Sequence, residues 1–167
     1  MWNTITIEEP PAILASEEEI EAFEARMQLA LPADHREFLK KFGEGVLFNH
    51  FRIFGLDKKT AEAKDFQDRW QEYFLWEDPD SALTVDQMAN CVIIGDNFNG
   101  DELVVSRDYP GEVFYLPQDE EQILRLGPSL EDALVKLVQQ QATAIEHYPD
   151  EEREEWDLRP VFNRASF

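Results

Sequence analysis

The segment from Gly95 to Glu102 holds the densest group of residues that could do chemistry. It reads GDNFNGDE, and its carboxylate and amide oxygens are ligand types that a cation such as Ca²⁺ prefers, or that a polar recognition loop would present. The EF-hand pattern does not fit, because placing Gly100 at the required glycine puts Gly95 at the first ligand position. A hairpin loop whose acids satisfy its own amides is the simpler interpretation. The candidate partner-binding residues are Asp96, Asn97, Asn99, Asp101 and Glu102.

Aromatic residues supply a second candidate binding surface. Helical spacing places three of them on one face, as a core stripe would require: Phe66, Trp70 and Phe74. Tyr73 and Trp76 lie further round the same predicted helix. Because aromatic side chains dominate protein interfaces, these two are added to the candidate partner-binding residues.

The sequence offers no recognisable catalytic or cofactor-binding pattern. Its histidines, His35, His50 and His147, are scattered, and there is no HExxH, GxSxG, Walker or Rossmann motif. Asp and Glu make up 36 of 167 residues, so close carboxylate pairs arise without any selection for chemistry. We therefore expect no enzyme activity, no cofactor and no metal. A hydrolase assembled from distant residues and the Asp96 to Glu102 loop is the remaining alternative.

The lone cysteine, Cys91, opens the apolar run Cys91–Ile94. A thiol in such a run behaves as a small buried hydrophobe, so core packing is predicted rather than nucleophilic chemistry. A single cysteine cannot form an internal disulfide, and residues 1–19 lack the basic and apolar regions of a secretory signal. No apolar run approaches the length that spans a bilayer. We expect a cytoplasmic protein.

Net charge is the strongest global signal. The chain carries a formal charge of −21 at pH 7, with 12% aromatic residues that separate it from the acidic disordered class. A negative field repels phosphate backbones and anionic lipids, which disfavours nucleic acid and membrane partners. The same field accelerates encounter with a basic protein, although solubility alone also explains it. We expect a basic protein partner, and the oligomeric state stays open.

The acidity belongs to the predicted folded body. Residues 149–167 hold six acidic and three basic residues, a net of −3, so the preceding 148 residues carry −18 of the −21. An acidic tail therefore does not account for the charge.

Two helices are predicted near the N-terminus. Ser16 and Glu19 make a capping box, and apolar residues at helical spacing predict a helix from Glu17 to Leu29. Pro32 or the residue after it opens a second helix, which stops at Gly43. The expected result is an N-terminal helical pair.

The middle of the chain alternates between strand and helix patterns. Short apolar stretches from Val46 to Phe54 predict one or two strands. The segment from Lys58 to Trp76 is expected to be helical, and Asp78, Pro79 and Asp80 end it.

Three successive strands are expected next: Cys91–Ile94, Leu103–Val105 and Val113–Leu116. Asn99-Gly100 suits a turn with positive φ between the first two, and Pro110-Gly111 fits the centre of a type II turn between the last two. An antiparallel meander follows, with a weaker strand at Gln122 to Leu126.

The fold class predicted by this order is α+β. Ser129 and Asp132 cap a final helix that ends before Pro149. The central sheet is expected to be mixed and mainly antiparallel, with helices packed on one face and the other face partly open. Residues 1–148 make a single domain, and residues 149–167 are an acidic extension, either docked through Trp156, Val161 and Phe162 or mobile.

Four sequence stretches, in this order, resemble the SUKH superfamily, which includes cell-wall assembly regulators of the SMI/KNR type and many bacterial immunity proteins. LPADHREFLKKFGEG resembles its helix between Leu-Pro and glycines, and CVIIGDNFNGDELVVS resembles its strand, Gly-Asp loop and returning strand. GEVFYLP and LGPSLEDALVKL are similar to its last hairpin strand and closing helix. His35 stands where the family often has tyrosine.

The resemblance implies an α+β fold and, in bacterial members, binding and neutralisation of a toxin. Many such toxins are nucleases, and a nuclease needs positive charge to hold phosphates. The leading expectation is therefore a non-catalytic immunity protein that binds and neutralises a basic toxin, for example a nuclease. The alternative is a regulatory scaffold like the SMI/KNR proteins.

Overall fold

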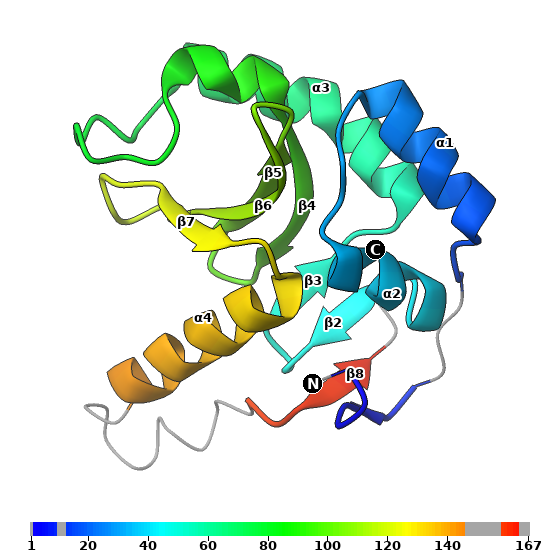
Figure 1. Ribbon diagram of the computed structural model, residues 1–167. Helices are drawn as coiled ribbons and strands as arrows, with labels where there is room; N and C mark the ends of the chain where they lie inside the picture. Colours follow the sequence, from blue (N-terminus) through cyan, green and yellow to red (C-terminus); the bar gives the residue numbers. More distant parts are fainter. Residues whose placement is uncertain (1, 10–12, 146–157, 164–167) are drawn as a thin grey trace.

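The computed structural model describes residues 2–9, 13–145 and 158–163, which form an eight-stranded mixed sheet and its covering helices (Figure 1). The strand order is β1-β8-β2-β3-β4-β5-β6-β7, and β1 with β8 is the one parallel pair in this part of the chain. The strands are β1 (Thr6–Ile7), β2 (Gly45–Leu47), β3 (Phe51–Ile53), β4 (Cys91–Asn97), β5 (Glu102–Ser106), β6 (Tyr109–Leu116), β7 (Leu124–Gly127) and β8 (Val161–Asn163). The helices are α1 (Glu17–Met27), α2 (Ala33–Lys41), α3 (Leu56–Glu72), the short 3-10 helix η1 (Val85–Asn90) and α4 (Leu130–Ile145). The α+β class and the mainly antiparallel sheet are confirmed.

The predicted meander of β4 to β7 is confirmed, but one turn is displaced. Antiparallel pairing joins β4 to β5, β5 to β6 and β6 to β7. The turn between β5 and β6 lies at Arg107 and Asp108, where the Asp108 N–H donates to Ser106 Oγ at 3.2 Å. Pro110 and Gly111 lie inside β6 instead, beside a register shift, so their turn-like sequence marks an irregular strand.

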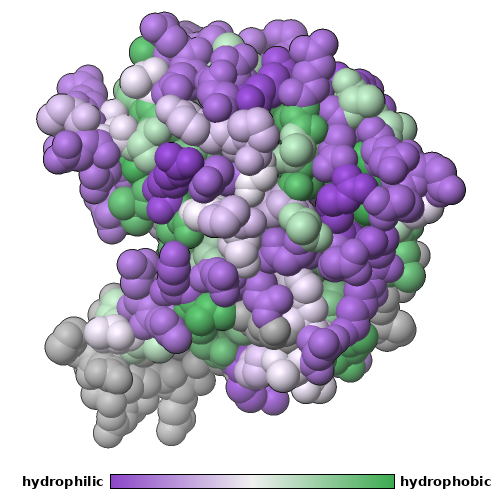
Figure 2. Space-filling model, viewed as in Figure 1, coloured by the Kyte–Doolittle hydropathy of each residue, from purple (hydrophilic) through white to green (hydrophobic). Residues whose placement is uncertain are grey.

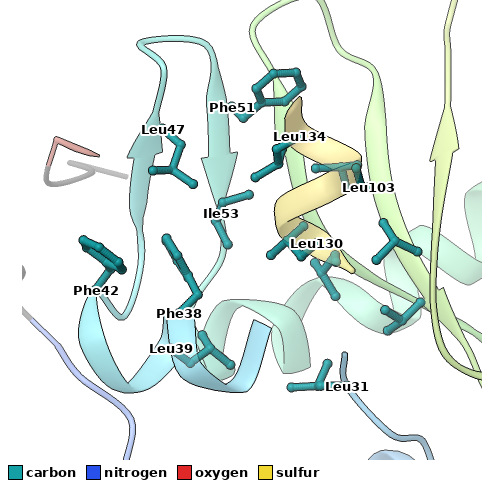
Figure 3. Close-up of a cluster of buried hydrophobic side chains, with 14 of the residues drawn as sticks. Leu31, Phe38, Leu39, Phe42, Leu47, Phe51, Ile53, Leu103, Leu130 and Leu134 are labelled. Atoms are coloured by element: carbon teal, nitrogen blue, oxygen red, sulfur yellow. The ribbon is translucent and has the colours of Figure 1, made fainter. Parts of the chain in front are cut away.

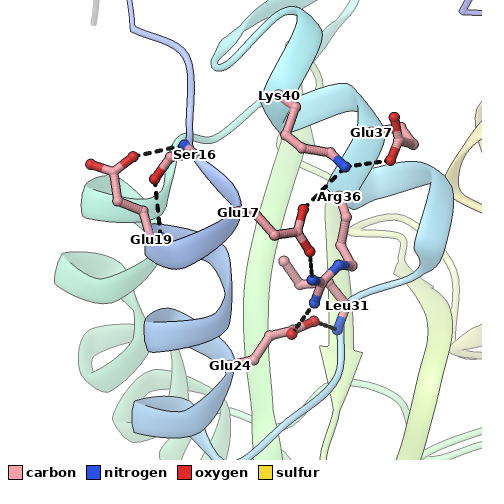
Figure 4. Close-up of polar contacts among 8 residues, drawn as sticks. All are labelled: Ser16, Glu17, Glu19, Glu24, Leu31, Arg36, Glu37 and Lys40. Carbon is pink, nitrogen blue, oxygen red and sulfur yellow. Dashed lines mark hydrogen bonds and ion pairs between the residues drawn. The ribbon is translucent and has the colours of Figure 1, made fainter.

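The N-terminal helical pair is held by charges that connect α1 to α2 (Figure 4). The capping box predicted at the start of α1 is present, with Ser16 and Glu19 bonded reciprocally. The Arg36 guanidinium on α2 pairs with both Glu17 and Glu24 on α1. Short helices such as α1 and α2 depend on tertiary contacts for their stability. The Arg36 pairs therefore add to the burial of the apolar faces in holding the two helices together.

The start of α4 is capped from another helix. Ser129 accepts the Asp132 N–H at 3.0 Å, as predicted. Asp34 of α2 in addition accepts hydrogen bonds from the N–H groups of Leu130 and Glu131, at 3.1 and 2.6 Å. The first four N–H groups of a helix have no acceptor within the helix. Here the Asp34 carboxylate, which is distant in sequence, accepts hydrogen bonds from two of them.

Buried side chains form two clusters, one on each face of the central strands. Residues that alternate along β4 separate between them, with Val92 and Ile94 in the larger cluster and Cys91 and Ile93 in the smaller. In the larger cluster, Leu130 and Leu134 of α4 lie towards Leu103, and Phe38 of α2 lies towards Ile53 (Figure 3). The expected helical layer on one face is therefore present.

The second face is covered too, which differs from the partly open face expected. Phe66 and Trp70 of α3, Trp76 and Leu83 from the following segment, and Met88 of η1 are all buried in the smaller cluster. The aromatic stripe of α3 is thus a core stripe, as its spacing predicted. An open sheet face that could carry a dispersed hydrolase site is not available over β4 to β6.

Part of the extension beyond residue 149 joins the sheet. Val161 to Asn163 form β8 between β1 and β2, and Val161 and Phe162 are buried. The pairing leaves Gly45 no room for a side chain, because a Cβ there would lie 2.2 Å from the Phe162 ring. Trp156, the third predicted docking residue, lies outside the described residues.

Candidate functional site

Asn97 organises the loop between β4 and β5. Its side-chain oxygen accepts the N–H groups of Asn99 at 3.0 Å and Asp101 at 2.9 Å, and its amide donates to the Asp101 carboxylate at 2.7 Å. Gly100 has a φ of 93°, which the tight turn requires and which L side chains avoid. Asn97 is buried, so its role is to hold the loop in one conformation.

Asp101 connects this loop to β6 and to the residues that follow it. Its carboxylate accepts the Tyr115 hydroxyl at 2.5 Å and the Gln118 N–H at 2.8 Å. Burial, and then the neighbouring Asp101 carboxylate, raises the pKa of Tyr115 far above its usual value. Tyr115 therefore stays a neutral hydrogen-bond donor at any physiological pH.

Two arginines neutralise the other loop carboxylates. Arg52 of β3 forms a bidentate pair with Asp96, with N to O distances of 2.6 and 2.5 Å. Arg69 of α3 pairs with Glu102, which also accepts the Trp70 indole N–H at 2.5 Å. Burial raises the pKa of Glu102 above its ordinary value, and these two donors oppose that shift.

These contacts identify the loop carboxylates as structural. Asp96, Asp101 and Glu102 each have protein donors, and no group of three or more His, Cys, Asp or Glu in the described ranges is arranged to hold a metal ion. Of the predicted loop residues, Asn99 is exposed, whereas Asn97 and Glu102 are buried. The turn interpretation of this sequence thus agrees with its geometry.

The two aromatic candidates, Tyr73 and Trp76, differ in exposure. Tyr73 is the C-cap of α3, and 60% of its side chain is exposed, as its predicted position requires. Trp76 was predicted on the same helix, but α3 ends at Glu72, four residues earlier than expected. Its ring is 1% exposed and lies 4.6 Å from the Trp70 ring, while its N–H donates to the Pro117 carbonyl at 2.7 Å. The surface position predicted for Trp76 is therefore wrong.

Exposed aromatic residues and arginines at the β4–β5 loop and the end of α3 are connected through ion-paired carboxylates, and we call this set the Phe98–Tyr73 surface. It consists of Arg52, Arg69, Tyr73, Asp96, Phe98 and Glu102. The Arg52 guanidinium lies 5.7 Å from the centre of the Phe98 ring, and Asp96 faces Glu102 across β4 and β5. Arg69 lies one helical turn before Tyr73, and the backbone N–H of Tyr73 donates to the backbone carbonyl of Arg69.

Three of these residues were missed at the sequence level. Phe98, exposed by 60%, was visible as the one large apolar residue in a polar loop. Arg52 and Arg69 gave no local signal, because the sheet register and helix packing bring them to the loop. Most of the face shown in Figure 2 is covered by hydrophilic residues with hydrophobic ones interspersed.

A groove of about 430 Å³, also missed, lies between α1 and the start of α3. Its walls are partly apolar, and Ile13 and Leu14 lie on its edge with exposures of 66% and 51%. The charged side chains in its lining are of both signs: Glu19, Arg26, Glu44, Asp57 and Lys58. The groove therefore has no single charge preference.

Three titratable groups are fully buried away from both surfaces. The His35 ring is 0% exposed, and neither of its nitrogens has a hydrogen-bond partner among the described residues. Lys59 Nζ donates to the Phe54 carbonyl, and burial lowers its pKa to about 7. Cys91 is buried as predicted, and burial raises the pKa of its thiol to about 12, so little reactive thiolate is expected at neutral pH. His147 lies outside the described residues.

A protein-family model matches most of the chain. The model of the SMI1 / KNR4 family (SUKH-1) matches residues 14–136, which include α1 to α3, η1, β2 to β7 and the first half of α4. No curated protein matches the sequence significantly. No helix in the described ranges is long and apolar enough to cross a bilayer.

Proposed function

Because the chain belongs to the SMI1/KNR4 (SUKH-1) family, we propose that it is an immunity protein that binds and neutralises a basic toxin. Members of this family are generally non-catalytic, which supports a role in protein binding. The resemblance found in the sequence already implied toxin neutralisation for bacterial members. Inhibition would follow from covering the toxin's active surface.

The observation that carries the proposal is the unbalanced charge of the folded body. From Trp70 to Leu124 the sequence has a single Lys or Arg, Arg107, among many acids. Within the described residues, no ion pair involves Glu72, Glu77, Asp119, Glu120 or Glu121. Carboxylates that are not used to stabilise the fold remain available to complement a basic surface such as a nuclease active site.

Co-purification with the toxin encoded beside the gene tests this function. The two proteins should elute as a stoichiometric complex at low salt, and the complex should weaken as salt screens the charges. The complex should also block the toxin's activity in a purified assay. Separate elution at low salt, or a complex in which the toxin stays fully active, would contradict the proposal.

The second candidate is a regulatory scaffold that recruits other proteins, the alternative role that the resemblance to SMI/KNR-type regulators implies. A deletion then perturbs a cellular pathway even where no toxin is present. An immunity protein predicts the opposite, since its deletion has an effect only when the toxin is made or delivered.

A further inference from the structure

We propose that the Phe98–Tyr73 surface is the docking site of this protein, and that its partner is a basic protein surface with an apolar centre. The inference rests on the proposed function and deepens it by assigning the contact to named residues.

The aromatic side chains are exposed but held in place. Phe98 projects from a loop whose backbone is bonded to the buried Asn97 side chain on both sides of Gly100. Its ring also packs near Arg52 and, at 6.4 Å, against the His50 ring. A side chain that is ordered before binding loses little conformational entropy on binding, which favours its use as an interface anchor.

The arginines between the aromatic residues are held in the same way. The side chains of Asp96 and Glu102 are only 15% and 8% exposed and fix the guanidinium groups, whereas those of Arg52 and Arg69 are 34% and 48% exposed. Arg69 also lies over the Trp70 ring at 4.8 Å. Arginine and aromatic residues are the types most enriched at interface hot spots. Because each arginine is paired, the centre of the surface is close to neutral.

The flanking carboxylates determine the charge of the partner. Glu72 precedes Tyr73, and the loop from Gln118 to Glu121 lies against the Phe98 loop through the bond from Gln118 to Asp101. The side chains of this loop and of Glu72 are exposed, and none has an ion pair with a described residue. An apolar and neutral centre with a negative rim matches a partner that has lysines or arginines around an apolar centre.

The groove between α1 and α3 is the rival surface, because Ile13 and Leu14 are also exposed there. It differs in charge, since Arg26 and Lys58 lie in its lining beside acidic residues. That mixture would not select a basic partner. The Phe98–Tyr73 surface is therefore the better match to the acidic character of the chain.

Matched double variants of the full chain test the assignment, with the toxin domain encoded beside the gene as the probe. Phe98→Ser with Tyr73→Ser removes the two exposed rings, and Ile13→Ser with Leu14→Ser removes a similar exposed apolar area at the groove. We expect the first pair to raise the Kd by about thirtyfold and the second to leave it within about threefold of wild type. Thermal unfolding of each variant checks that the fold is retained, which the exposure of all four side chains favours.

A charge pair extends the test to the rim. Glu120→Lys and Glu21→Lys change the net charge equally, and both positions are exposed. We expect Glu120→Lys to slow association and flatten its salt dependence more than Glu21→Lys on α1 does.

The outcomes separate the two proposals. Wild type that fails to bind the toxin at low salt overturns the proposed function and this inference with it. Wild type that binds, together with a Phe98/Tyr73 variant that binds equally well, overturns this inference alone. Loss of binding in the Ile13/Leu14 variant only would move the contact to the groove and also overturn it.

Discussion

The indole N–H of Trp70 donates a hydrogen bond of 2.5 Å to the Glu102 carboxylate, and both residues are buried. This bond ties the last turn of α3 to the first residue of β5. It also favours the charged form of this carboxyl group, whose pKa burial raises.

Trp70→Phe is expected to lower the free energy of unfolding by about 2 kcal/mol at about pH 8, because it removes a donor from a buried charged acceptor. The cost should be smaller at about pH 5 than at about pH 8, because the raised pKa of Glu102 makes this carboxylate easier to protonate as pH falls. Urea unfolding at both pH values measures this. The control is Trp76→Phe, which removes an indole N–H bonded to the Pro117 carbonyl. Because that acceptor does not titrate, this variant should lose the same free energy of unfolding at both pH values. Equal pH dependence in the two variants would count against the role of Glu102.

Lys59→Met is expected to raise the free energy of unfolding at pH 7 by roughly 2 kcal/mol, because burying an ammonium group is unfavourable. The pKa of Lys59 is lowered from 10.5 to about 7, chiefly by burial, and Glu44 opposes this. Between these values the unfolded chain holds a proton that the folded chain has lost, so wild-type stability rises with pH from about 7 towards 10.5. The variant should lack this rise in urea unfolding followed to about pH 9.5. A parallel rise in both proteins would contradict the assignment.

His35→Leu is expected to stabilise the fold by about 1 to 3 kcal/mol, because two unpartnered ring nitrogens leave the core. Burial, and then the nearby Lys59, holds the pKa of His35 well below 6.5. Below pH 6.5 His35 takes up a proton in the unfolded chain but stays neutral in the folded chain. The free energy of unfolding therefore falls as pH falls. The variant should therefore lose less stability than wild type between about pH 7 and about pH 5. A variant no more stable than wild type would mean that the histidine has a bonding partner.

Cys91 should resist alkylation in the folded protein. With a pKa of about 12 and no exposed surface, its thiol gives almost no accessible thiolate. Iodoacetamide at about pH 8 is expected to leave the native chain unmodified and to add one group in concentrated urea, as read by intact mass. Rapid modification of the native protein would place the thiol at the surface.

Short-range features were predictable from the sequence, and long-range ones were not. The capping box of Ser16 and Glu19 depends on residues three apart, and the structure contains it as predicted. The end of α3 was misplaced because Phe74 continues the aromatic spacing of Phe66 and Trp70. Both Phe74 and Trp76 pack against the same cluster from a segment that is no longer helical. Periodicity reports which residues are buried, and it does not separate a helix from a loop folded onto the same core.

The candidate site shows the same division. The turn chemistry of Asn97 and Gly100 could be predicted, because it is local. The pairing of Arg52 with Asp96 depends on the register of β3 with β4, and that of Arg69 with Glu102 on the packing of α3. Neither β1 nor β8 was predicted as a strand, since each has only two or three residues and pairs with segments that are distant in the sequence.

The cap that Asp34 places on α4 makes two distant helices a single cooperative unit. When α2 opens, the amides of Leu130 and Glu131 lose their acceptor, and the first turn of α4 loses its anchor. Local opening of one helix is thus coupled to fraying of the other, although almost a hundred residues separate them along the chain. Slow-exchanging amides of α2 and of the first turns of α4 would then exchange with deuterium at a common free energy, as members of one foldon.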